Sequence, residues 1–221
     1  MEKFDVAICG SGPAGTSAAY VLASAGMKTA LIDRSSFPRE KLCGGLLSGR
    51  ARTVFEDIFK EDWSPAYEKV TRGAAFFHKG KLLAETEGGD DMYLTTRTLF
   101  DTYLFSLAEK KGAHVIQGAS VTSVDKGFVN LKNATGINAD FIIGADGVTS
   151  RVRESLFPGS FKKQEYGLCF QVDTPDDKRL AQMSLPEIHF GCVKWGYGWA
   201  FPKKNALSVG MGGSLWRNPD M

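Results

Sequence analysis

The chain has 221 residues, of which 43% are hydrophobic and 24% are charged, and its formal net charge is +2. This composition is typical of an ordinary globular protein, and it excludes low-complexity and disordered classes. Basic residues are spread along the chain and no apolar run is long enough to span a membrane or form a signal segment, so we expect a cytoplasmic protein that does not bind nucleic acid.

The first predicted element is a strand over residues 4–9 that runs directly into a glycine-rich turn of the form GxGxxG. Gly10 permits the tight turn, and Gly12 lets the backbone approach a pyrophosphate. Gly15 allows the following helix, predicted over 14–25, to lie close to the sheet. The N-terminus of that helix carries about half a positive charge, which suits a phosphate.

A second parallel strand is predicted over residues 28–32 and is followed at once by Asp33. An acid at this position accepts hydrogen bonds from both ribose hydroxyls of a dinucleotide and repels a 2′-phosphate, so it favours FAD or NAD over NADP. Strand, glycines, helix, second strand and acid all fall in register. The unit therefore predicts an adenine dinucleotide site.

The rest of the chain first continues the α/β pattern and then changes character. Beyond Arg153 the pattern is β-type alternation with aromatic residues and no strong helix, so we expect an antiparallel layer to begin near Leu156. We expect a hairpin over 70–86, with its turn at Lys79-Gly80, to join that layer. The other predicted elements are a loop over 34–50, helices over 51–60 and 95–111, and strands over 113–117, 121–125, 128–131 and 139–143.

The cysteines and histidines show no pattern typical of a metal site or a disulfide framework. There are four cysteines without a CxxC pair, and three scattered histidines. We therefore expect reduced thiols and no metal. These residues are Cys9, Cys43, Cys169, Cys192, His78, His114 and His189.

Three further segments resemble a known flavoprotein family. The run from Phe141 to Arg153 resembles the GD motif of flavoproteins related to aromatic hydroxylases. The run from Pro38 to Ser48 resembles the loop that covers the flavin in geranylgeranyl reductases and their FixC-like relatives, and Tyr197 to Pro202 resembles the aromatic substrate-side motif of the same family. Together the motifs cover most of the chain.

The resemblance implies an α/β fold in which a Rossmann-like FAD-binding domain of the aromatic-hydroxylase type carries an antiparallel β-sheet substrate domain. We expect residues 1–69 and 87–155 to form the first domain, and residues 70–86 and 156–221 to form an incomplete second one. The FAD contacts that the resemblance implies are Gly10, Ser11, Gly12, Pro13, Ala14, Gly15, Asp33, Arg34, Gly44, Gly45, Arg97, Val121, Asp146 and Gly147. Arg97 has an alternative interpretation, as a solvated arginine at a helix start.

The family resemblance also implies the chemistry, which is hydride transfer from reduced flavin to an isoprenoid double bond. Tyr197, Trp199 and Phe201 alternate along a strand and so point to one face, toward either substrate or core, and Pro202 follows them. Cys43 is the candidate catalytic residue, because its loop would place the thiol beside the flavin; a small buried hydrophobe is the alternative. No general acid is evident.

Two other functions stay open at this point. A hydroxylase or halogenase uses the same FAD scaffold, but halogenases show Trp-x-Trp-x-Ile-Pro where this chain has Tyr197 and Phe201. The other is a flavin-binding fragment or electron-transfer module. The sequence does not identify the electron donor, NAD(P)H or ferredoxin, nor the isoprenoid, any peripheral membrane contact or the oligomeric state.

The family pattern continues beyond the residues present here. Relatives follow the aromatic motif with a third flavin segment, Gly-Asp-Ala-Ala-Gly and a helix, which this sequence lacks, although Leu207 to Gly213 resembles the strand leading to it. We therefore expect the N-terminal part of a longer enzyme or a truncated gene product. By itself such a chain should bind FAD weakly, aggregate readily and show little or no reductase activity.

Overall fold

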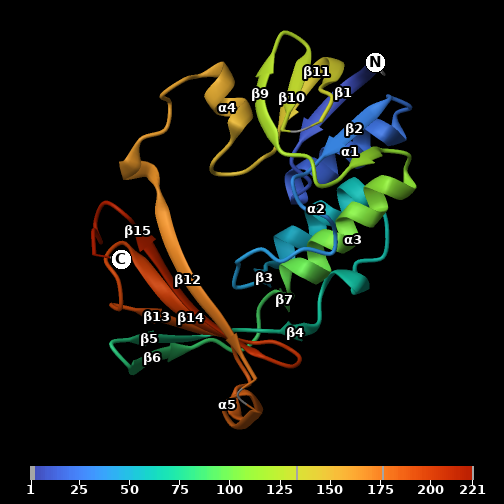
Figure 1. Ribbon diagram of the computed structural model, residues 1–221. Helices are drawn as coiled ribbons and strands as arrows, with labels where there is room; N and C mark the ends of the chain where they lie inside the picture. The colour runs from blue at the N-terminus through green and yellow to red at the C-terminus, as the bar shows by residue number, and fades with distance from the viewer. Residues whose placement is uncertain (1–2, 133, 176, 221) are drawn as a thin grey trace. The chain divides into compact units, whose positions relative to one another are not determined.

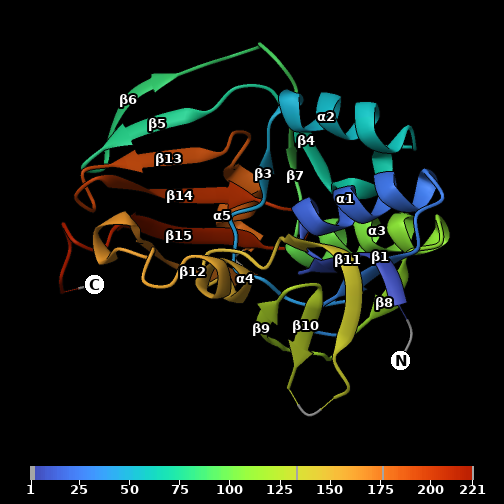
Figure 2. The ribbon, with the colours of Figure 1, turned by 90° about the horizontal axis from the view of Figure 1, so that it is seen from above.

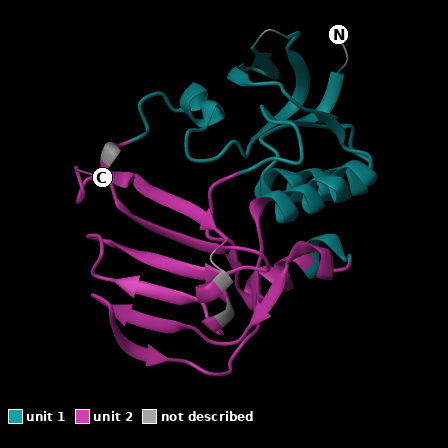
Figure 3. Ribbon diagram, turned by 60° about the horizontal axis from the view of Figure 1, so that its bottom comes forward, with its two compact units in different colours: residues 1–40, 56–61, 98–161 teal, residues 41–55, 62–97, 162–221 magenta. Residues whose placement is uncertain are grey.

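The structure is a computed structural model that describes residues 3–132, 134–175 and 177–220. Its backbone contacts divide the chain into two units (Figure 3), each discontinuous in sequence. Unit 1 comprises 1–40, 56–61 and 98–161, and unit 2 comprises 41–55, 62–97 and 162–221. These boundaries differ from those suggested by the sequence, because the segments 41–55, 62–69 and 87–97 carry short strands that belong with unit 2.

Unit 1 is built on a six-stranded sheet with the order β8-β2-β1-β11-β10-β9 (Figure 1). The first four strands in this order are parallel, and β10 and β9 add an antiparallel edge. The strands are β1 (Lys3–Cys9), β2 (Thr29–Ile32), β8 (His114–Ile116), β9 (Val121–Asp125), β10 (Phe128–Leu131) and β11 (Ile137–Gly144). The predicted parallel unit is present, and the predicted strands over 121–125 and 128–131 pair as a hairpin with its turn at Lys126-Gly127.

The adjacent parallel strands β1 and β2 are largely apolar and buried on both faces, as parallel strands usually are, whereas β11 is mostly half-buried or exposed. All of β2 is buried, and Ile8 of β1 is fully inaccessible. A core cluster of this unit includes Phe4, Cys9 and Val129. The helices of this part of the chain are α1 (Pro13–Ser24), α3 (Arg97–Lys110) and α4 (Arg151–Leu156).

Unit 2 contains a second six-stranded sheet, with the order β12-β15-β14-β13-β5-β6 (Figure 2). The predicted hairpin over 70–86 supplies β5 and β6, so it joins this layer. Every pairing is antiparallel except that of β5 with β13, which is parallel. These two strands are far apart in sequence, so no hairpin sets their relative direction. The strands are β5 (Ala75–His78), β6 (Lys81–Glu85), β12 (Gly167–Thr174), β13 (Glu187–Phe190), β14 (Gly196–Pro202) and β15 (Leu207–Ser214).

Unit 2 also holds a three-stranded sheet, β3-β7-β4, that the sequence analysis did not predict. Its strands are β3 (Leu46–Leu47), β7 (Met92–Leu94) and β4 (Lys69–Thr71). The first arm of the hairpin predicted over 70–86 is thus divided between two sheets, because β4 pairs with β7 whereas β5 pairs with β6 and β13. The remaining elements are α2 (Gly49–Phe59), α5 (Asp177–Gln182) and two short 3-10 helices, Ser64–Ala66 and Lys163–Glu165.

Candidate functional site

The glycine turn after β1 is too tightly enclosed for side chains. A Cβ atom built on Gly10 would lie 2.4 Å from the carbonyl oxygen of Ala145, and one on Gly15 would lie 1.8 Å from the carbonyl oxygen of Gly10. The end of β11 is fixed against the turn, since Ala145 donates its N–H to the carbonyl of Cys9 at 2.8 Å. The turn therefore brings the GxGxxG segment beside Asp146, which follows Ala145.

The helix after this turn is open to an anion at its N-terminus. α1 begins at Pro13 with Gly12 as its N-cap, and no side chain accepts a hydrogen bond from its first N–H groups. The hydroxyl of Ser11 is buried and has no hydrogen-bond partner among the described residues. Unpaired N–H groups at a helix N-terminus together with a buried, unpartnered hydroxyl are groups that a bound pyrophosphate would satisfy. These residues fit FAD.

Asp33 fastens the end of β2 to the glycine turn. Its Oδ2 accepts a hydrogen bond from the backbone N–H of Ser11 at 2.7 Å, and its Oδ1 accepts one from that of Ser35 at 2.9 Å. An ionised carboxylate has about four acceptor positions. Two of these positions are used within the protein, so the carboxylate can still accept from ribose hydroxyls.

Asp146 has a structural role that the GD motif does not reveal. Its carboxylate accepts hydrogen bonds from the hydroxyl of Ser150, from the backbone N–H of Arg151 at 2.6 Å and from that of Val152 at 3.2 Å. These bonds fix the start of α4. Gly147, next to it, is exposed with open space around it, so its backbone can be reached from solvent.

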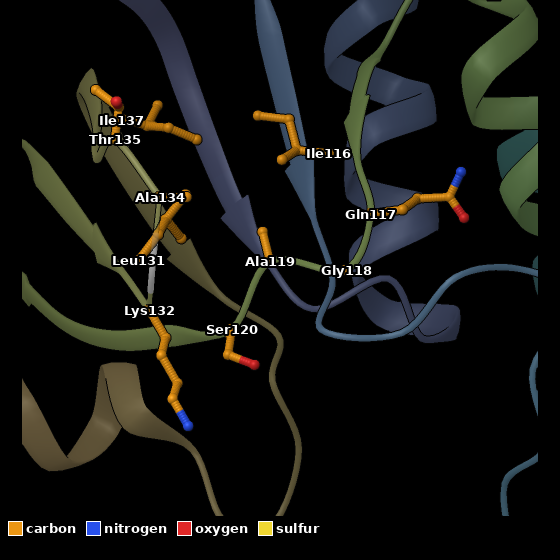
Figure 4. Close-up of a pocket in the computed structure, with 10 residues that line it drawn as sticks. All are labelled: Ile116, Gln117, Gly118, Ala119, Ser120, Leu131, Lys132, Ala134, Thr135 and Ile137. Atoms are coloured by element: carbon orange, nitrogen blue, oxygen red, sulfur yellow. The ribbon is translucent and has the colours of Figure 1, made fainter.

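The two other predicted contacts of unit 1 lie apart from the turn's hydrogen-bond network. Arg34 is exposed, and Val121 is half-buried at the start of β9. Val121 adjoins a cavity of about 490 Å³ that is lined by residues 116–120, 131, 132, 134, 135 and 137 (Figure 4). In Figure 4 the side chains of Gln117 and Lys132 extend in different directions, to the right and downward. None of the predicted FAD contacts lines it.

A buried ion pair in unit 1 was missed by the sequence analysis. Arg39 Nη2 lies 2.8 Å from Asp101 Oδ2, and the Asp101 side chain is fully buried. The Arg39 guanidinium also lies over the ring of Phe37, which stacks on Phe105 of α3. These contacts fix the loop after Asp33 to α3. No local pattern could have indicated them, because both partners are residue types that are usually exposed.

In unit 2, the Gly44-Gly45 segment lies against the aromatic strand β14. A Cβ atom on Gly44 would be 2.8 Å from the Phe201 ring and 3.1 Å from Trp199 Nε1. Gly45 has a φ of +74°, and its Cβ would lie 2.0 Å from the carbonyl oxygen of Thr95. The loop and the aromatic motif, far apart in sequence, are therefore in direct contact.

Tyr197, Trp199 and Phe201 share one face of β14, as predicted. Ring centroids are 6.1 Å apart for the first pair and 6.3 Å apart for the second. Trp199 and Phe201 are buried and Tyr197 is 46% exposed, so the row runs from a core into solvent. Pro202 is buried at the end of the strand. Trp199 Nε1 has no hydrogen-bond partner among the described residues.

A cavity of about 370 Å³ lies at the exposed end of this aromatic row. Opposite the row, β15 carries glycines: Tyr197 pairs with Gly212, and Trp199 pairs with Gly210. The Trp199 ring would be 2.3 Å from a Cβ on Gly210, so the indole occupies space that a side chain would fill. Aromatic rings over glycines form an apolar surface that continues into the cavity. Its lining residues are Gln164, Glu165, Tyr166, Gly167, Cys169, Trp195, Gly196, Tyr197, Trp199, Gly212, Gly213 and Ser214.

The remaining predicted residues of unit 2 are Cys43 and Arg97. Cys43 is exposed, next to Gly44, so it is not a buried hydrophobe. Arg97 is half-buried at the start of α3. Cys9, in contrast, lies in the unit 1 core, where burial and, to a smaller extent, the charge of Asp146 raise the pKa of its thiol to about 12.

Comparison with known proteins identifies the family. A family model described as FAD binding domain matches residues 3–180. The chain belongs to this FAD-binding family. The predicted Rossmann-like flavoprotein fold is thereby confirmed, and FAD is the supported cofactor.

Curated relatives also confirm the resemblance to geranylgeranyl reductases. The chain is 31% identical over 235 residues to the chloroplastic geranylgeranyl diphosphate reductase of Arabidopsis thaliana, covering 96% of this chain and 48% of that protein. It is 29% identical over 222 residues to digeranylgeranylglycerophospholipid reductase of Methanococcus vannielii, covering 96% and 55%. The chain thus spans about half the length of the curated relatives it matches.

Solved structures place the chain in the same fold. A geranylgeranyl bacteriochlorophyll reductase-like protein from Thermoplasma acidophilum has a TM-score of 0.79 at 28% identity, over 97% of this chain and 57% of that one. A myxobacterial chondrochloren halogenase has a TM-score of 0.76 at 22% identity, over 100% and 55%. At that lower identity the likeness shows the shared fold alone.

Neither a metal site nor a membrane-spanning helix is found in the described part of the chain. No group of three or more histidine, cysteine or acidic side chains there could hold a metal ion. Among the same residues, no helix is both long enough and apolar enough to cross a membrane.

Proposed function

We propose that the chain carries the flavin site of an FAD-dependent oxidoreductase that reduces isoprenoid double bonds. The observation that carries this proposal is the contact of the Gly44-Gly45 loop with the aromatic face of β14, which continues into an apolar cavity. A loop without side chains suits a flat flavin ring, and the aromatic face suits a hydrocarbon chain. The names of the relatives support the same substrate class.

Different residues of the chain would bind FAD, hold the substrate and donate the proton. The α1 N-terminus and Asp33 would hold the pyrophosphate and the adenosine ribose, and Arg34, Arg97, Val121, Asp146 and Gly147 would complete the FAD contacts. Trp199 and Phe201 would hold the alkene and exclude water. When bound, reduced FAD would supply hydride to one alkene carbon. Cys43, exposed beside Gly44, is the candidate proton donor to the other.

The experiment uses chemically reduced, FAD-loaded chain in molar excess over the isoprenoid, so that slow turnover still yields measurable product. Geranylgeranyl diphosphate, a digeranylgeranyl ether lipid and a prenylated quinone are each incubated without oxygen, and the lipids are analysed by mass spectrometry. We expect one class to gain a pair of hydrogen atoms. FAD retention with no product from any class would favour the flavin-binding fragment instead.

Two controls test the role of Cys43 and the class of reaction. Cys43→Ala should leave FAD affinity nearly intact while slowing product formation; an unchanged rate would remove Cys43 from the chemistry. Admitting oxygen distinguishes a monooxygenase or halogenase, because such an enzyme consumes oxygen in proportion to product, whereas a reductase only leaks peroxide.

NAD(P)H and ferredoxin are the electron donors to compare, and flotation with vesicles tests peripheral membrane contact.

A further inference from the structure

A buried lysine follows directly after the aromatic strand of unit 2. Lys203 is the first residue after β14, and its side chain is 3% exposed, whereas the adjacent Lys204 is exposed. The backbone N–H of Lys203 donates to the carbonyl of Ala206 at 2.9 Å, which closes the turn into β15. At this turn the side chain of Lys203 is therefore buried and that of Lys204 is exposed to solvent.

Its burial is not explained by its ion pair. Lysine is almost never buried unless its charge is paired, because removing an ammonium from water costs free energy. Among the described residues, the ion pair of Lys203 joins Nζ to Asp173 Oδ2 at 3.9 Å, and the Asp173 side chain is 43% exposed. A long pair with a partly solvated carboxylate stabilises the fold little.

The Lys203 ammonium lies beside the Gly44-Gly45 loop. A Cβ atom built on Gly45 would be 3.4 Å from Lys203 Nζ. The preceding alternate residues, Trp199 and Phe201, lie against Gly44 in the same way. Trp199 and Phe201, on one face of β14, and Lys203, directly after the strand, therefore all lie beside the loop. Lys203 is the charged residue among the three.

We propose that Lys203 sets the reduction potential of the flavin by stabilising the negative charge that the flavin gains on reduction. This inference rests on the proposed FAD site at Gly44-Gly45. When a two-electron donor such as a reduced nicotinamide transfers hydride to flavin, the donor is oxidised and the ring keeps one net negative charge until it takes up a proton. A fixed cation next to the loop that carries the ring favours this reduced form, since charges near the ring tune its electronics. Asp173 partly offsets the effect.

The test measures the midpoint potential of the FAD-loaded chain by spectroelectrochemical titration. Lys203→Met should shift the equilibrium at least about tenfold toward oxidised flavin, which lowers the two-electron potential by about 30 mV. Lys203→Arg should keep the potential, and the matched control Lys204→Met should leave it unchanged. The affinity of Lys203→Met for oxidised FAD, measured by equilibrium dialysis, should stay within about threefold, because the oxidised ring is neutral.

A second variant covers the case in which Lys203→Met does not fold. Asp173→Asn removes the half-exposed negative charge and should shift the equilibrium the other way, toward reduced flavin. Equal potentials in Lys203→Met and Lys204→Met, with FAD bound to both, would overturn this inference alone. Where Lys203→Met does not fold, equal potentials in Asp173→Asn and Lys204→Met would overturn it. Failure of the unsubstituted chain to bind FAD would overturn both the proposed function and this inference.

Discussion

The carboxylate of Asp33 accepts a hydrogen bond from the backbone N–H of Ser11 at 2.7 Å and so joins the end of β2 to the glycine turn after β1. The residue that the dinucleotide pattern assigns to ribose recognition is therefore also part of the turn's own hydrogen bonding. Any substitution of Asp33 should change both cofactor affinity and the stability of the unliganded chain.

Asp33→Ala should weaken FAD binding by about tenfold to hundredfold, because hydrogen bonds to a charged acceptor are worth about 1.5–3 kcal/mol. FMN should be affected far less, since it lacks the adenosine ribose. Calorimetry with both flavins measures the ratio. The control is Asp5→Ala: Asp5 also accepts a backbone hydrogen bond, from Lys28 at 2.7 Å, but at the other end of β1. Equal losses for FAD and FMN in Asp33→Ala would remove Asp33 from the ribose site.

The pair of Arg39 and Asp101 should behave as a buried ion pair. Asp101→Asn or Arg39→Met should lower the free energy of unfolding by about 3–5 kcal/mol, because either change breaks a buried ion pair by removing one of its two charges. Urea denaturation measures this. The exposed pair of Lys3 and Asp140 is the control, and Lys3→Met should leave the free energy of unfolding nearly unchanged, because solvent screens this pair. Similar small losses in both pairs would contradict the burial that we describe.

Cys9 should make the fold sensitive to alkali. Burial raises its pKa to about 12 in the folded chain from the ordinary thiol value of 9.0, so the folded state holds this proton more tightly than the unfolded state. The resulting stability is fully present below pH 9 and should be lost by about 1.4 kcal/mol per unit as pH rises toward the folded pKa. Cys9→Ala should remove that part of the pH dependence.

Thiol labelling provides a separate check on Cys9. Iodoacetamide at pH 8 should modify the exposed Cys43, Cys169 and Cys192 and leave Cys9 unmodified until the chain is denatured. Mass spectrometry of the peptides identifies the labelled residues. Rapid labelling of Cys9 in the native chain would show that β1 is not buried as described.

A substitution of Gly45 has two costs, the strain of its positive φ and the collision of the new Cβ atom with its neighbours. Comparison with Gly26 distinguishes the two. Both residues have positive φ, +74° for Gly45 and +80° for Gly26, but a Cβ on Gly26 has nothing within 4 Å. Gly26→Ala should therefore cost only the conformational strain of about 1–2 kcal/mol. Gly45→Ala should cost a further 1–3 kcal/mol or so from its collision with the Thr95 carbonyl. Equal thermal stability of the two variants would contradict the close approach.

Trp199 should contribute both to the core and to the substrate surface. Trp199→Ala should lower stability by about 3–5 kcal/mol, and it should weaken binding of long isoprenoids more than of short ones. Trp195, 78% exposed at the same cavity, is the control, and Trp195→Ala should leave stability nearly unchanged. Equilibrium dialysis with isoprenoids of increasing length measures how binding affinity depends on chain length. A uniform loss at every length would make Trp199 a core residue only.

Local patterns predicted the nucleotide unit well, because its parts are close together in sequence. The helix expected over 14–25 is observed at Pro13–Ser24, and the shared face of Tyr197, Trp199 and Phe201 follows directly from strand alternation. The three-stranded sheet was missed because its strands are too short to show a period and pair across long separations, as Leu46 does with Leu94. Elements set by residues close in sequence were therefore predicted, and the sheet set by pairing between distant residues was not.

The candidate site was predictable only where a residue type is required by the backbone or by a ligand. Gly10 and Asp33 are such positions. Lys203 gave no signal, because a lysine after a strand is usually solvated and only the turn to β15 and the Gly45 loop bury it. The hydrogen bonds of Asp146 to the start of α4 were equally invisible, since they depend on how the chain folds back after Gly147.

Anaerobic reoxidation of the bound flavin shows whether this chain binds flavin for alkene reduction. FAD-loaded chain is reduced, mixed with less than one equivalent of the isoprenoid selected by mass spectrometry, and followed by flavin absorbance. We expect oxidised flavin to appear in proportion to the saturated product, and more slowly in Trp199→Ala. If the flavin stays reduced with every isoprenoid and is reoxidised only when oxygen is admitted, the chain is not an alkene reductase.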